Sequence, residues 1–139
     1  MYKLPPLPYK YDALEPHVDE QTMRIHYDIH HKGYVDNLNK ALSGHKELSG
    51  KPVEKLLAEI DRVPEDIRQT VINNGGGHSN HSLFWEIMSS PPDGGSKPEG
   101  DLKDALNKKF GGFDKFKEAF NGKAMTVFGS GWVFLIGPL

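Results

Sequence analysis

Residues 23–35 read Met23-Arg24-Ile25-His26-Tyr27-Asp28-Ile29-His30-His31-Lys32-Gly33-Tyr34-Val35. Apolar and aromatic side chains recur in this stretch at steps of three and four residues, the period of an amphipathic helix. The same period extends over residues 19–42, so the sequence predicts one long helix there. Because residues four apart share a helix face, His26, His30 and Tyr34 are predicted to form one ridge.

A second group of histidines lies in residues 73–85, which read Asn73-Asn74-Gly75-Gly76-Gly77-His78-Ser79-Asn80-His81-Ser82-Leu83-Phe84-Trp85. Helical bundles build metal sites from inward-facing side chains on two helices. Imidazole suits manganese, iron, zinc and copper alike, so histidine does not choose the metal. The alternative is that these histidines are hydrogen-bonded residues of an apolar core. The spacing leaves both interpretations open.

The rest of the chain divides into two parts. Shorter helices are predicted near residues 53–60, 64–74 and 78–88, with Gly75-Gly76-Gly77 as the break between the last two. Residues 91–98 are rich in proline and glycine and predict a loop. Two more helices are predicted near residues 102–110 and 113–120. We therefore place an N-terminal helical domain at residues 1–90 and the beginning of an α/β domain at residues 91–139.

Residues 132–136, Trp-Val-Phe-Leu-Ile, are rich in aromatic and β-branched side chains and predict a buried strand. A single strand has no neighbour for its backbone N–H and C=O groups. The sequence therefore predicts that the second domain is incomplete in this chain.

Composition excludes several classes of protein. The 139 residues are 37% hydrophobic and 26% charged, with a formal net charge of −2, so a nucleic-acid-binding surface is not expected. No apolar run is long enough to span a bilayer, and the first residues lack the apolar core of a secretory signal. The absence of cysteine excludes disulfides and thiolate metal sites. A cytoplasmic protein is expected, and a bacterial cytoplasm is favoured over a mitochondrion.

Four strings of residues, spread over nearly the whole chain, resemble the manganese/iron superoxide dismutase family. They are Leu7-Pro8-Tyr9 with Tyr11-Asp12-Ala13-Leu14-Glu15-Pro16, the histidine-rich residues 23–35, residues 73–85, and Phe128-Gly129-Ser130-Gly131-Trp132. The resemblance implies an α+β fold. An N-terminal antiparallel helical hairpin would be followed by the helices and first strand of an α/β domain, incomplete here.

The resemblance also implies a metal site. His26 and His81 would be the metal ligands that the N-terminal domain provides. His30 and Tyr34 would lie beside the ligands, at the channel by which superoxide arrives.

Other residues would surround this site in the family. His31 would belong to the hydrogen-bonded shell, and Trp85 and Trp132 would form aromatic walls. In relatives, three residues lie near the interface of the dimer: His30, Phe128 and Ser130.

The implied activity is the dismutation of superoxide to oxygen and hydrogen peroxide by one manganese or iron ion per subunit. Iron-type relatives carry glutamine where this chain has Gly77, so Gly77-His78 and Phe84 favour manganese over iron. The implied partners are superoxide and further copies of the chain, in a homodimer or homotetramer of the full-length parent.

One feature departs from the family. Relatives complete the site with an aspartate and a histidine from an Asp-x-Trp-Glu-His-Ala-Tyr-Tyr-like segment, which this sequence lacks, and no histidine follows His81. Our hypothesis is that the parent is a dismutase and that this chain alone has little activity. The alternative is a non-catalytic helical protein that binds a metal or a partner, pairing its strand with another chain.

Overall fold

The computed structural model describes residues 1–90 and 97–137. The chain forms two compact units, Met1–Gly94 and Gly95–Leu139, and each is described by itself. Among the described residues, the secondary structure is helical and no strand is present. None of the helices in these residues is both long enough and apolar enough to cross a membrane.

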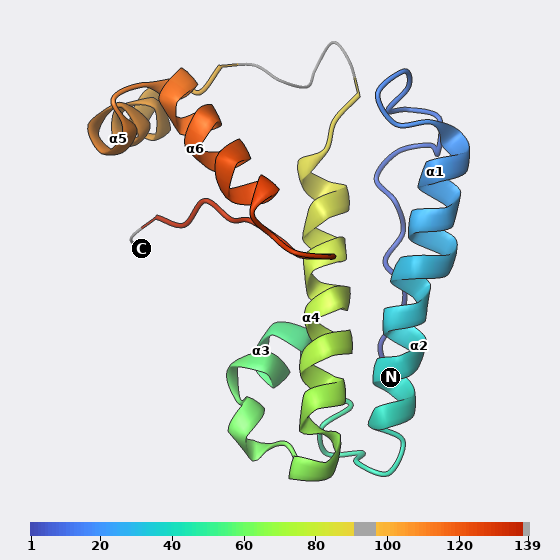
Figure 1. Cartoon of the computed structure of the whole chain (residues 1–139). Helices are drawn as coiled ribbons and strands as arrows, with labels where there is room; N and C mark the ends of the chain where they lie inside the picture. The colour runs from blue at the N-terminus through green and yellow to red at the C-terminus, as the bar shows by residue number, and fades with distance from the viewer. Residues whose placement is uncertain (91–96, 138–139) are drawn as a thin grey trace. The chain divides into compact units, whose positions relative to one another are not determined.

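The first unit is a hairpin of two long helical arms (Figure 1). The first arm runs without interruption through α1 (Glu20–Arg24), the π-helix η1 (Ile25–His31) and α2 (Lys32–Ala41). It begins at Asp19, whose carboxylate accepts a hydrogen bond from the backbone N–H of Thr22 at 2.8 Å. The long helix predicted for residues 19–42 is therefore confirmed, although its middle third is π-helical.

The second arm is α4 (Glu65–Ile87), which packs against α2 (Figure 1). The predicted break at Gly75-Gly76-Gly77 is wrong, because α4 continues through all three glycines. Close packing explains this. A Cβ at Gly75 would lie 3.3 Å from the Leu57 side chain, and one at Gly77 would lie 2.6 Å from the Tyr34 ring. The glycines weaken the helix locally, by about 1 kcal/mol each relative to alanine, but they let neighbouring side chains approach its backbone.

Two short helices follow the first arm, α3 (Val53–Ala58) and the 3-10 turn η2 (Ile60–Arg62). They close one hydrophobic core between the arms. Burial of each large apolar side chain in such a core contributes about 1.5–3 kcal/mol. Its buried members are Leu38, Leu42, Leu48, Val53, Leu56, Val63 and Val71.

A second core lies at the other end of the hairpin, where Leu14, Met23, Tyr27 and Trp85 are buried. The proline-rich N-terminal segment packs on it through apolar side chains that include Leu4 and Leu7. Residues 1–7 of the segment have no regular secondary structure, because proline lacks the backbone N–H that helices and sheets use.

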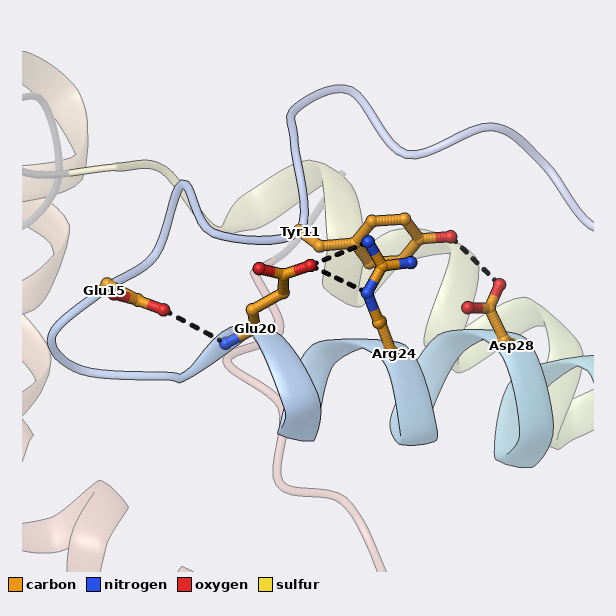
Figure 2. Close-up of polar contacts among 5 residues, drawn as sticks. All are labelled: Tyr11, Glu15, Glu20, Arg24 and Asp28. Carbon is orange, nitrogen blue, oxygen red and sulfur yellow. Dashed lines mark hydrogen bonds and ion pairs between the residues drawn. The ribbon is translucent and has the colours of Figure 1, made fainter.

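Polar contacts fasten this segment to the first arm (Figure 2). The Tyr11 hydroxyl donates to Asp28 at 3.0 Å, and the Arg24 guanidinium lies 4.1 Å from the centre of the Tyr11 ring. Glu20 holds that guanidinium through an ion pair at 2.7 Å. The N-terminal segment is thus part of the hairpin domain.

The second unit contains α5 (Gly100–Phe110) and α6 (Phe113–Met125). The turn between them requires glycine, because Gly111 and Gly112 have φ values of 80° and 135°. The helices predicted near residues 102–110 and 113–120 are confirmed. Leu106 of α5 is buried within this unit. Most of the predicted loop at residues 91–98 lies outside the described residues.

Residues 132–136, predicted as a strand, have no strand hydrogen bonds. The reason is physical: a strand forms only when a neighbouring strand pairs with its backbone, and the described residues contain none. The expectation of a helical hairpin followed by part of an α/β domain is confirmed. The first strand expected in that second domain is not formed in the described residues.

Candidate metal centre

Three histidines from the two arms converge on one point. His26 and His30 come from η1 and His81 from α4, and one ring nitrogen of each lies within 4.8 Å of the others. The Nε2 atoms of His26 and His81 are 3.0 Å apart. The ridge predicted from the four-residue spacing thus meets the second histidine group across the hairpin.

The π-helical turn shapes the first arm at this point. In a π-helix the backbone hydrogen bonds run over five residues, and such turns occur frequently at functional sites. His26 and His30 lie one turn apart in it, with ring centres separated by 5.3 Å. Sequence spacing did not predict this turn, because steps of three and four residues also fit an α-helix.

A hydrogen bond orients the ring of His81. Its Nδ1 lies 2.7 Å from the carbonyl oxygen of Gly77. A carbonyl only accepts, so Nδ1 carries the proton and Nε2 presents its lone pair toward His26. This arrangement, with one ring nitrogen tied to a backbone carbonyl, is typical of histidines that bind metals through the other nitrogen.

Burial keeps the imidazoles of His26 and His81 uncharged at neutral pH. Burial, reinforced by the nearby His81 and His30, lowers the pKa of His26 to about 4. Burial also lowers the pKa of His81. A neutral imidazole offers a lone pair, whereas a protonated one repels a cation, so both rings are in the state that a metal ion requires.

The donor set fits a first-row transition metal. Histidine nitrogens bind zinc at about 2.0–2.1 Å, and two nitrogens bound side by side to an ion of this kind lie close to the 3.0 Å seen here. Imidazole ligands suit manganese and iron as well as zinc. The group formed by the described residues contains histidines only, without a carboxylate.

A buried row of rings lies behind the three histidines. The Trp85 indole N–H donates to Nδ1 of His31 at 2.9 Å, and Nε2 of His31 lies 2.9 Å from Nδ1 of His78. The ring of His31 stacks on that of His81, with centres 5.4 Å apart. His31 and Trp85 therefore lie next to the candidate centre. No role at the centre was predicted for His78. It lies three residues before His81, so the two residues are neighbours on the same helix, and this spacing could have indicated that His78 lies near the centre.

Tyr34 closes another side of the centre. Its ring lies edge-on to His30, with centres 4.9 Å apart, and 5.3 Å from the ring of His81. It also lies directly over the backbone of Gly77. Tyr34, which was predicted to lie beside the histidines, can lie there because Gly77 of α4 has no side chain.

The remaining predicted residues belong to the second unit. Trp132 stacks on Phe134 with ring centres 6.4 Å apart, while Phe128 and Ser130 are exposed within that unit. Their roles at a metal centre or an interface stay predictions.

Comparison with known proteins identifies two matching families of domains. The alpha-hairpin domain of iron/manganese superoxide dismutases matches residues 1–89, and the C-terminal domain of the same enzymes matches residues 98–138. The first match covers the whole helical hairpin.

Individual relatives agree with these matches. The chain is 59% identical to the manganese superoxide dismutase of Listeria innocua over 135 residues, which are 97% of this chain and 66% of that protein. It is 55% identical to the manganese enzyme of Pseudomonas aeruginosa over 134 residues, 96% of this chain and 64% of the relative. A relative from Methylomonas, named a Mn/Fe superoxide dismutase, is 54% identical over 134 residues, 96% of this chain and 65% of that protein. The chain thus spans slightly less than two thirds of the relatives it matches.

Replacement of Gly77 tests the close approach of Tyr34. In Gly77→Ala the new methyl group overlaps the Tyr34 ring, so the free energy of unfolding should fall by about 1–3 kcal/mol and the ring should move. Gly76→Ala is the matched control, because no atom lies near its Cβ; it should be neutral or stabilise the helix by up to about 1 kcal/mol. Urea unfolding and the NMR signals of the Tyr34 ring measure both effects. Equal stability of the two variants would contradict this packing.

Stability without metal should fall on mild acidification. The pKa values of His26 and His31 drop from 6.5 to about 4 and about 3, mainly through burial. The unfolded chain therefore binds more protons below pH 6.5, and the free energy of unfolding decreases as the pH falls toward 4. The slope is about 1.4 kcal/mol per pH unit for each proton of difference. Urea unfolding between pH 7.5 and 5.0, with a chelator present, measures the slope, and His26→Gln should reduce it. An unchanged stability over this range would refute the assignment.

Proposed function

This chain belongs to the iron/manganese superoxide dismutase family, and we propose that it holds the metal ion of such an enzyme through His26 and His81. The observation that supports this most directly is the 3.0 Å separation of their two Nε2 atoms, which come from separate arms of the hairpin. The names of the relatives favour manganese, with iron as the alternative. No observation favours the alternative of a non-catalytic binding protein.

The proposed reaction converts two superoxide ions and two protons to oxygen and hydrogen peroxide. When bound, manganese or iron supplies the one-electron redox couple that this reaction needs. The chain's own residues have three tasks: to hold the ion, to admit a small anion and to deliver protons.

Holding the ion requires one proton to move. Nδ1 of His81 carries its proton, so the hydrogen in the contact between the two Nε2 atoms belongs to His26. For both Nε2 atoms to be ligands, His26 must adopt the tautomer with its proton on Nδ1. In that tautomer both Nε2 atoms would offer a lone pair to an ion, and the hydrogen bond between the two arms would be given up.

Proton delivery falls to His30 and Tyr34. His30 is exposed to water, and the ring of Tyr34 lies edge-on to it and also beside the ring of His81. A general acid must stand within hydrogen-bond reach of the atom it protonates, directly or through one water. We therefore assign these two side chains to the protonation of the peroxide product and not to metal binding.

Two neutral histidines are a small ligand set for a trivalent ion. The family's Asp-x-Trp-Glu-His segment is absent from these 139 residues. We propose that the chain alone binds a metal ion weakly and turns over little superoxide, since no carboxylate joins the histidine group among the described residues.

Further proposals concern assembly and location. We place a contact between two or four copies near His30, Phe128 and Ser130; Phe128 is fully exposed, as an unpaired interface residue would be. A division into domains 1–90 and 91–139 is supported by the compact unit Met1–Gly94. The cytoplasm is the proposed location.

Substitution of the two ligands tests the function. His26→Ala and His81→Ala should each weaken Mn²⁺ and Co²⁺ binding by at least about tenfold, because each removes one of two nitrogen ligands. Isothermal titration and the visible spectrum of bound Co²⁺ measure the affinity, and superoxide consumption is followed on the same samples. His17→Ala, at an exposed position outside the hairpin arms, is the control. Undiminished metal binding in both ligand variants would refute the proposal, and a large loss in His30→Ala would make His30 a ligand.

A further inference from the structure

The row of Trp85, His31 and His78 has a fixed hydrogen-bond direction. An indole N–H can only donate, so Nδ1 of His31 accepts and the proton of His31 sits on Nε2. That proton is donated to Nδ1 of His78, 2.9 Å away, which must therefore be unprotonated. His78 then carries its proton on Nε2. The geometry alone thus sets the tautomers of both histidines.

His78 is the acceptor that ends this row. The hydroxyl of Ser82 lies 3.5 Å from Nδ1 of His78 but is directed to the carbonyl oxygen of the same residue at 2.8 Å. His31 is completely buried and His78 is 7% exposed, so water does not readily replace this acceptor. Without it, the Nε2–H of His31 would be a buried donor with no acceptor, which is an unfavourable state.

The ring of His31 is in turn a surface against which His81 rests. The two rings are inclined by only 26°, with centres 5.4 Å apart. The Gly77 carbonyl at Nδ1 and the His31 ring on one face are thus two of the contacts that orient His81. A change in the plane of the His31 ring would therefore disturb one of the contacts that aim the Nε2 of His81 at His26.

Contacts of the N-terminal segment brace His78 from outside. The Tyr2 ring lies edge-on to His78, with centres 5.9 Å apart. Tyr2 is held by a reciprocal pair of backbone hydrogen bonds with the Asn39 side chain, at 2.8 and 2.9 Å, and by its hydroxyl on the Lys51 carbonyl. The ring of His78 therefore lies against a side chain whose residue is held by three hydrogen bonds.

We propose that His78 is a positioning residue for the metal centre, which acts by accepting the Nε2–H of His31 and so fixing the ring on which His81 stacks. This inference rests on the proposed function, because it assigns His78 to the same centre. His78 does not touch the ion or the substrate. It sets the orientation of a ligand through one intervening ring, as residues that orient metal-bound histidines do.

Two substitutions of His78 separate positioning from general packing. His78→Leu removes the acceptor while filling much of the same space. His78→Asn keeps an acceptor oxygen near the position of Nδ1. We expect Co²⁺ binding by the 139-residue chain to weaken by about 10- to 100-fold in His78→Leu and to stay within about threefold of the unsubstituted chain in His78→Asn. Titration of the visible Co²⁺ spectrum measures the affinity, and circular dichroism shows that each variant is folded.

A second measurement needs no variant and no metal. Nitrogen-15 NMR of the imidazoles in the metal-free chain should show Nδ1 unprotonated and Nε2 protonated in both His31 and His78. A proton on Nδ1 of His78 overturns the proposal, even if His78→Leu does not fold.

The outcomes also separate this inference from the proposed function. Equal Co²⁺ affinity in folded His78→Leu and the unsubstituted chain overturns the positioning role alone, because the ligands remain intact. Equal losses in the Leu and Asn variants also overturn it, since they would show a packing effect. Failure of the unsubstituted chain to bind Co²⁺ more tightly than His26→Ala overturns the proposed function and this inference together.

Discussion

The structure depends on the contact between two uncharged imidazoles across the hairpin. Nε2 of His26 and Nε2 of His81 approach to 3.0 Å, and burial lowers the pKa of both rings. Buried polar nitrogens are tolerable only when each has a partner, so the surroundings must supply one for every ring nitrogen that faces the core. The Gly77 carbonyl and the Trp85 indole meet this demand for His81 and His31. These contacts hold the two arms close together. A side chain at Gly77 would therefore overlap the Tyr34 ring, so the glycine makes room for Tyr34.

Much of the hairpin could be predicted from periodicity. Residues 19–42 have a continuous three- and four-residue pattern, and the ridge of His26, His30 and Tyr34 follows from it. The break predicted at Gly75-Gly76-Gly77 was wrong because local propensity weighs against glycine, whereas close packing of Leu57 and Tyr34 on α4 favours it. Helix propensity depends on residues that are close in the sequence. Leu57 and Tyr34 are distant from the glycines in the sequence, so propensity could not predict their effect.

Other features had no local signal at all. The π-helix Ile25–His31 has the residue spacing of an α-helix, so only the structure distinguishes them. The residues 132–136 have strand-forming side chains, yet a strand exists only as one member of a pair. The choice of His26 and His81 as ligands came from the resemblance to a family. The comparisons confirm that family, and the two ligands stay predictions. Spacing alone had favoured a hydrogen-bonded core over a metal site.

The separation of the paired histidines along the chain sets the order in which they meet during synthesis. His26 and His81 are 55 residues apart. A ribosome adding about 5–20 residues per second takes roughly 3–11 s to cover that interval. Until the second arm has been made, His26 and His31 lack the His81 ring and the Trp85 indole that they contact in the folded hairpin. The three ring nitrogens of His26, His30 and His81 can therefore come together only after α4 has been translated.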